Sequence, residues 1–117
     1  MIIDAHFHLG HVPLFRSFDI SVERYVAYMD RLHIAYCLNV HSRGLVIDEP
    51  EAGMEESIRA YEVSGGRILS YYLYNPNDPD RSIRLMERYP QREIFRAIKL
   101  HPSMHGISAD DPRYEAA

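Results

Sequence analysis

Apolar and polar positions follow two alternating patterns along the chain. Four short apolar runs are typical of buried β-strands, and three segments between them repeat their apolar residues every three to four positions, as amphipathic helices do. The predicted strands cover residues 2–5, 34–40, 67–74 and 94–100, and the predicted helices cover residues 21–32, 51–64 and 79–89. The chain therefore alternates strand and helix from its first residues onward.

Local start signals support the predicted helices. Ser21 precedes the first helix and Asp78 precedes the third, and both side chains can accept a hydrogen bond from a free backbone N–H of the first turn. Pro79 follows Asp78 at the first helical position, where proline is favoured. The pair Asp111-Pro112 repeats this signal, so we expect a further helix to begin near residue 111.

This order of elements predicts a fold class. Alternation of strand and helix favours parallel strands with helices packed outside them. Successive predicted strands begin about 30 residues apart, the size of a right-handed strand–helix–strand unit, and eight such units close a barrel of about 250 residues. We therefore predict an α/β fold in which residues 1–117 form one partial domain. That domain would be the N-terminal half of a (β/α)8 TIM barrel, with four parallel strands in chain order.

Composition narrows the function classes. Hydrophobic residues make up 46% of the chain and charged residues 26%, which is ordinary for a soluble globular protein. The net charge is −4 with both signs mixed, so there is no basic stripe for a nucleic acid. No apolar run approaches the roughly 20 residues of a membrane helix, and the first strand leaves no room for a signal peptide. Cys37 is the single cysteine, so we expect a cytoplasmic protein with one buried thiol.

The end of the first predicted strand carries the first candidate chemistry. Asp4, His6 and His8 share one face if the strand continues through His8. Barrel enzymes keep their active sites at this C-terminal end of the strands. Two imidazoles at this spacing can both reach one first-row metal ion, whereas Asp4, deeper along the strand, would orient a histidine as an outer partner. Two surface histidines in a loop would give the same short pattern, but its position favours the metal pair.

The fourth predicted strand ends in a similar way. Lys99 and His101 share one face of that strand. A lysine directed into a barrel is costly to bury unless it is paired or functional. The alternative is that Lys99 lies at the exposed rim and that His101 only shapes a turn, and periodicity alone does not separate the two.

Three motifs resemble a known family. The segment "IIDAHFHLG" resembles the first-strand motif of the amidohydrolase superfamily. The segments "AIKLHPSMHG" and "YNPNDPD" resemble the fourth-strand region and the turn after the third strand in its amidohydrolase-related branch, which includes the aminocarboxymuconate-semialdehyde decarboxylases. The resemblance covers nearly the whole chain, but only the N-terminal half of the family's domain.

The resemblance implies a fold, a cofactor and a reaction. It implies a (β/α)8 barrel with one or two divalent metal ions, usually zinc, held in part by His6 and His8. Lys99 matches a lysine that, when carboxylated, bridges two metals in some members, and that when unmodified could hold a substrate carboxylate. His101 lies in the same segment. The implied activity is hydrolysis of an amide or ester, or decarboxylation of a small carboxylic acid, on a small-molecule substrate.

Two neighbouring families fit less well. TatD-type nucleases share the first motif but carry an acidic metal ligand near the fourth strand, where this chain has "AIKLHP". PHP phosphoesterases usually have Ser or Thr after the second histidine, where this chain has Leu9.

The family's active site needs groups that this chain does not supply. Further histidines come from its fifth and sixth strands, and an aspartate that acts as ligand and base comes from the eighth. The other histidines are not placed in the sequence to replace these missing ligands; they are His11, His33, His41 and His105. Of these, only His41, which comes just after the second predicted strand, could approach the barrel mouth. We therefore assign no catalytic base.

Three readings of the function remain open. The chain could be half of an enzyme that a complementing C-terminal half completes, a remnant without turnover, or a metal-binding half-barrel that forms a homodimer. As an isolated monomer we expect no turnover and only weak zinc binding, because two histidine ligands hold a metal less firmly than the three protein ligands of a usual catalytic zinc site.

Overall fold

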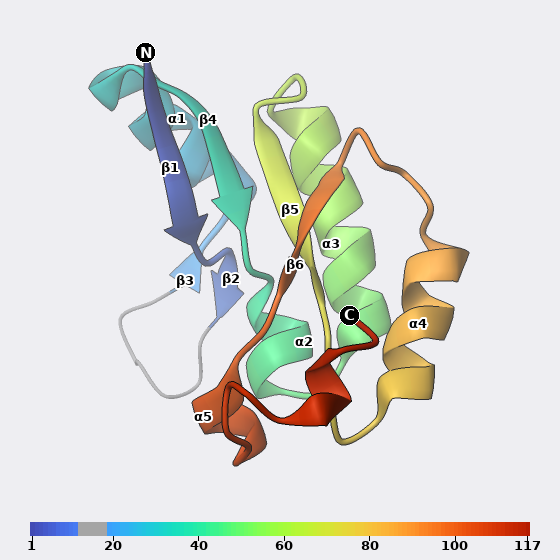
Figure 1. Cartoon of the computed structure of the whole chain (residues 1–117). Coiled ribbons are helices and arrows are strands. Elements are labelled where there is room, and N and C mark those ends of the chain that lie inside the picture. Colours follow the sequence, from blue (N-terminus) through green and yellow to red (C-terminus); the bar gives the residue numbers. More distant parts are fainter. Residues whose placement is uncertain (12–18) are drawn as a thin grey trace.

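The computed structural model describes residues 1–11 and 19–117 and shows a mixed α/β fold built on a parallel sheet (Figure 1). The sheet has four strands in the order β1 (Ile2–Phe7), β4 (Ile34–Asn39), β5 (Ile68–Leu73) and β6 (Phe95–Lys99). All three neighbouring pairs are parallel, which confirms the predicted parallel sheet in chain order. Such a sheet is compatible with half of a barrel.

Three helices form the crossovers between these strands. They are α1 (Val22–Leu32), α3 (Pro50–Val63) and α4 (Pro79–Arg88), each within one residue of its predicted range. Ser21 Oγ accepts from the N–H of Arg24 at 3.3 Å, and Asp78 Oδ1 accepts from the N–H of Arg81 at 3.1 Å, so both predicted caps form. α1 and α3 lie behind the sheet in Figure 1. None of the described helices is long and apolar enough to cross a membrane.

Several short elements were not predicted. β2 (Gly10–His11) and β3 (Asp19–Ile20) form a small antiparallel pair, and α2 (Ser42–Val46) and α5 (Pro102–His105) follow the ends of β4 and β6. The helix expected near residue 111 is a single 3-10 turn, η1 (Pro112–Tyr114), with Asp111 accepting from the N–H of Arg113. In Figure 1 these short elements gather at the C-terminal ends of the four parallel strands.

The core lies between the sheet and the helices. In its first half, the ring of Phe7 on β1 stacks on Tyr25 of α1 at 3.9 Å between centroids, and Cys37 is fully buried beside Met29. In its second half, Tyr72 stacks on Phe95 at 4.7 Å. Burying each such large apolar side chain contributes about 1.5–3 kcal/mol, so these contacts fix the helices to one face of the sheet.

The opposite face of the sheet has no helix across it in Figure 1. The hydroxyl of Tyr71 on β5 donates to the carbonyl oxygen of Ala5 on β1 at 2.9 Å, so it reaches across the intervening strand β4. Neighbouring strands are about 4.8 Å apart, and a contact between the first and third strands is therefore compatible with a sheet that curves toward this face.

Strand β1 is irregular, and this corrects one prediction. Its register with β4 shifts between Ile2 and Ile3 and again between Asp4 and Phe7. As a result Asp4 and Phe7 both contact Tyr25 of α1, although strict alternation would place them on opposite faces. Strict alternation would also place Ile3 and Ala5 with Phe7 on the face that the helices cover, but both are exposed and Ile3 keeps 51% of its surface accessible.

Candidate functional site

The two histidines of the first motif lie together at the C-terminal end of β1. Their ring centroids are 5.1 Å apart, with the ring planes tilted by 58°. His6 is exposed and His8 is half-buried. Both imidazoles therefore point to the same side of the chain and are open to a ligand that contacts the two rings.

The backbone fixes the protonation pattern of His8. Its Nδ1 lies 2.8 Å from the carbonyl oxygen of Val40, the residue that follows β4. A carbonyl can only accept, so Nδ1 carries the proton and Nε2 keeps a free lone pair. Metal-ligating histidines almost always donate their other ring N–H to such an outer acceptor, which holds the ring in place. His8 is thus presented as a ligand through Nε2.

Electrostatics keep His8 neutral. Burial lowers its pKa, and positive charge on His6, Lys99 and His101 lowers the pKa further, against the opposing bond to Val40. The neutral imidazole is the form that binds a metal ion. Lys99, at the end of β6, and His101, two residues further along, are thus among the groups whose charge acts on His8.

Asn39 holds the loop that carries His8, and the sequence reasoning missed it. Its side-chain oxygen accepts from the N–H of Leu9 at 3.0 Å, and its amide nitrogen donates to Ser57 of α3 at 3.4 Å. Asn39 is fully buried. The available signal was a polar residue near the end of the otherwise apolar segment 34–40.

Among the described residues, Asp4 makes no hydrogen bond to an imidazole ring. Its Oδ1 accepts from the backbone N–H of His6 at 3.1 Å, and its Oδ2 accepts from the Tyr25 hydroxyl at 2.8 Å. This bond and burial both raise the pKa of Tyr25, with burial the larger cause. Asp4 therefore positions the strand ahead of the histidine pair, where an outer partner of an imidazole was expected.

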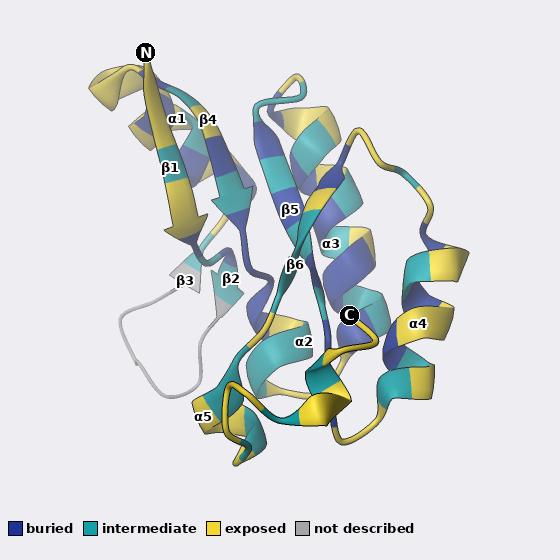
Figure 2. Cartoon of the chain, viewed as in Figure 1, coloured by how far each residue is buried: buried dark blue, intermediate teal, exposed yellow. Residues whose placement is uncertain are grey.

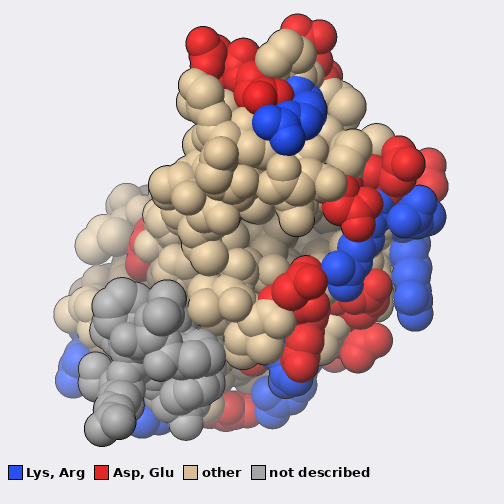
Figure 3. All heavy atoms as spheres, turned by 90° about the horizontal axis from the view of Figure 1, so that it is seen from below, with Lys and Arg blue, Asp and Glu red and all other residues tan. Residues whose placement is uncertain are grey.

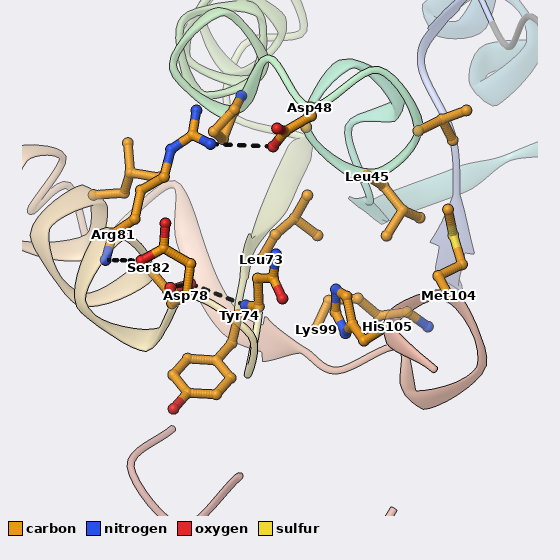
Figure 4. Close-up of a pocket in the computed structure, with 15 residues that line it drawn as sticks. Leu45, Asp48, Leu73, Tyr74, Asp78, Arg81, Ser82, Lys99, Met104 and His105 are labelled. Carbon is orange, nitrogen blue, oxygen red and sulfur yellow. Dashed lines mark hydrogen bonds and ion pairs between the residues drawn. The ribbon is translucent and has the colours of Figure 1, made fainter. Parts of the chain in front are cut away.

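Lys99 ends β6 and lines a pocket of about 220 Å³ (Figure 4). In that view Lys99 and His105 lie together at one side, and Arg81 lies at the other, paired with Asp48 at 3.2 Å. Lys99 makes no ion pair with any described residue. Lys99 therefore adds a cation to the lining of this pocket, which His6 and His8 do not line.

His101 has a local contact. Its Nδ1 is 3.2 Å from the hydroxyl of Ser103, and it stands at the first position before α5. This contact matches the turn-shaping alternative, while the lowering effect of His101 on the pKa of His8 leaves a ligand-binding role as a proposal.

The remaining histidines are placed as follows. His33 is the C-cap residue of α1 and adopts the left-handed conformation, φ 55°. His105 ends α5 and lines the pocket with Lys99. The side chain of His11 lies outside the described residues.

His41 does not face the mouth, which corrects the expectation for it. It is fully buried, and its Nδ1 accepts from the N–H of Gly44 at 3.2 Å, which caps α2. Burial lowers its pKa to about 4. A Cβ atom built on Gly44 or Gly53 would overlap its ring, so both glycines make room for it. His41 is a structural residue of the α2–α3 packing.

The donor set at the histidine pair is small. In residues 1–11 and 19–117, no group of three or more His, Cys, Asp or Glu side chains is arranged to hold a metal ion. Figure 3 views the molecule from below, the side of the strands' C-terminal ends, and uncharged residues occupy the centre of that view, with Asp, Glu, Lys and Arg around its margins. The pair by itself therefore provides two nitrogen ligands.

The comparisons with known proteins add no relative. No protein-family model, no curated protein and no solved structure matches the chain. The family that the motifs resemble is consequently taken up as a proposal.

Proposed function

We propose that the chain forms the N-terminal half of an amidohydrolase-like barrel and supplies part of a metal site, with His6 and His8 as ligands of one divalent ion, zinc. The observation that carries the proposal is the bond from His8 Nδ1 to the Val40 carbonyl oxygen, because it leaves Nε2 free to bind while the centroid of the His6 ring lies 5.1 Å from that of His8. A zinc ion held there would act as a Lewis acid toward a substrate carbonyl or carboxylate group.

The chain's own residues have separate tasks in this proposal. Val40 and Asn39 hold the His8 ring and its loop. Lys99 attracts a carboxylate of a small-molecule substrate or, when carboxylated, takes part in the metal site as a bridging ligand, and His101 follows it two residues later in the chain. The reaction is hydrolysis of an amide or ester, or decarboxylation of a small carboxylic acid. The remaining ligands and the base come from a complementing C-terminal half or from a second copy.

The proposed setting is the cytoplasm, with neither nucleic acid nor membrane as partner. Two features support it: the one cysteine is a buried free thiol, and charges of both signs are mixed along the chain.

The second candidate is metal binding without turnover. The observation that favours it is the commitment of Asp4 to the N–H of His6 and to the Tyr25 hydroxyl. A carboxylate held in this way is not free to act as a general base for a substrate at the histidine pair.

A zinc titration of the full chain by calorimetry tests the shared part of both candidates. His8→Asn is the sharp variant, because the asparagine amide can still donate to the Val40 carbonyl while the Nε2 ligand is lost. His33→Asn is the matched control, since it also removes one imidazole and asparagine tolerates the left-handed backbone at that position. Zinc binding that survives His8→Asn unchanged would contradict the proposal.

Activity assays separate the two candidates. With zinc added, the first candidate predicts hydrolysis or decarboxylation once a second copy or a complementing C-terminal half is present, and the second candidate predicts none. A monomeric sample should show no turnover under either, since Asp4, the carboxylate held beside His6, is committed to other bonds. Turnover from a species of monomer mass, abolished by His6→Ala, would overturn this expectation.

A further inference from the structure

The sheet has two free edges among the described residues. β1 pairs only with β4, and β6 pairs only with β5. An edge strand presents unpaired backbone N–H and C=O groups, which favour pairing with another strand. The two edge strands run in the same direction and have nearly equal lengths of six and five residues. Each edge therefore matches the other in polarity and in length.

The face without helices is also open. Asp4 and Cys37 are cross-strand partners, and both contact α1, so their neighbours Ile3 and Tyr36 point to the opposite face. Ile3 is 51% and Tyr36 44% exposed, and Figure 2 shows the exposed surface of β1. All-parallel sheets in soluble proteins have both faces covered. These two side chains therefore belong to an apolar surface that fits a partner.

The next positions on this face continue the apolar surface. Leu38 pairs with Leu69, and both are half-buried. Tyr71 then spans from β5 to the Ala5 carbonyl oxygen. An occupant of this face must therefore be apolar and must fit a surface that curves around it.

The charges on the two edge strands indicate which strand each edge would pair with. Asp4 is the only charged residue of β1 apart from its histidine, whereas β6 carries two cations, Arg96 and Lys99. A contact between two β1 edges or two β6 edges would place like charges together. A contact of β6 with a second β1 places opposite charges together, which favours that pairing.

We infer that two copies of this chain close an eight-stranded parallel barrel, with β6 of each copy paired to β1 of the other. A two-fold axis parallel to the strands makes both seams at once and turns the two open faces toward each other. Eight strands enclose an interior just wide enough for side chains to fill. Ile3 and Tyr36 become buried in this dimer.

The dimer also changes the metal site. A rotation about an axis parallel to the strands keeps all eight C-terminal ends on one side, so both histidine pairs and both copies of Lys99 meet at one mouth. Four imidazoles then replace the two of a single copy, and the second copy supplies ligands that the single chain lacks. This consequence rests on the proposed function, whereas the barrel closure does not.

Sedimentation equilibrium of the full chain, across a hundredfold range of concentration, tests the closure. We expect a mass of twice 13.7 kDa. Ile3→Lys places a charge at the seam and should weaken association at least tenfold. The matched control is Ile83→Lys on α4, where the same change occurs at a side chain that is 37% exposed on a helix and not on an edge strand, and it should leave the dimer intact. Tyr36→Lys is the second variant, and circular dichroism shows that each variant is folded.

Each outcome decides one claim. A monomer at the highest concentration would overturn the inference and leave the open face to another partner, and so would a series of open-ended larger species. If Ile3→Lys and Ile83→Lys weakened the dimer equally, the result would contradict the proposed pairing of β6 with β1 of the second copy. A zinc titration of the same samples separates the claims: a dimer that binds no zinc contradicts the proposed function alone, and a monomer that binds zinc through His6 and His8 contradicts the dimer alone.

Discussion

His8 and His41 follow neighbouring parallel strands, and they are used in opposite ways. His8 Nδ1 faces the Val40 carbonyl oxygen and must donate, so its Nε2 is free to bind. His41 Nδ1 faces the Gly44 N–H and must accept, so its proton lies on Nε2, which is buried without a partner among the described residues. The comparison shows that the backbone group opposite Nδ1 decides whether a histidine at a strand end is presented as a ligand or built into the core.

The largest expected effect comes from Gly53→Ala. Alanine in a helix interior is normally about 1 kcal/mol better than glycine, but here its methyl group would overlap the His41 ring. We expect the free energy of unfolding to fall by about 3 kcal/mol or more, as in overpacked cores. Urea unfolding measures it, and His41→Ala is the partner variant: in that background Gly53→Ala should cost little. A loss of the same size in both backgrounds would contradict the structural role of His41.

The second prediction concerns pH. Because burial lowers the pKa of His41 from 6.5 to about 4, the unfolded chain takes up a proton at a higher pH than the folded chain. The stability contributed by neutral His41 is full above pH 6.5 and is lost as the pH falls toward 4, by about 2–3 kcal/mol. Urea unfolding at pH 7.5 and 4.5 measures the difference. His41→Asn can still cap α2 but does not titrate, and it should lose this part of the pH dependence; an unchanged difference would show that other groups cause it.

The third prediction concerns the other histidine. His8→Asn should weaken zinc binding at least tenfold, which is about 1.4 kcal/mol, because the Nε2 ligand is removed while the bond to Val40 is kept. His41→Asn should leave zinc binding unchanged. Calorimetric titration of both variants with zinc measures the two affinities. An equal loss of zinc affinity in the two variants would contradict the different roles of His8 and His41.

The smallest expected effect is that of Tyr25→Phe. It removes the hydroxyl that donates to Asp4 and should cost about 1 kcal/mol of unfolding free energy. Zinc affinity should stay within twofold of the wild type, since among the described residues Asp4 hydrogen-bonds to the backbone of His6 and to no imidazole. A tenfold loss of zinc affinity would show that Asp4 acts on the metal pair.

The fold could be predicted from the sequence where the periodic pattern was long. The strands and crossover helices carry clear periods and caps, such as those at Ser21 and Asp78. The short helices α2 and α5 could not be predicted, because five and four residues are too few to show a helical repeat of apolar positions. The irregularity of β1 also escaped prediction, since it depends on Asp4 and Phe7 both packing on Tyr25.

The candidate site was predictable in its residue types but not in its tautomers. The spacing of His6 and His8 on one strand indicates that they lie together. The group opposite each ring is set by tertiary structure: the Val40 carbonyl is 32 residues from His8 in the chain. Gly53, which looks like a weak point of a helix, makes sense only once the His41 ring is known to lie against it.

The most direct test of this account is the protonation pattern of the two rings, measured by long-range proton–nitrogen correlation NMR on protein labelled with nitrogen-15 at histidine. We predict at neutral pH that His8 carries its proton on Nδ1 and His41 on Nε2, and that zinc shifts the His8 Nε2 signal while leaving both His41 nitrogens unchanged. A proton on Nε2 of His8, or a zinc response at His41 and none at His8, would contradict the account.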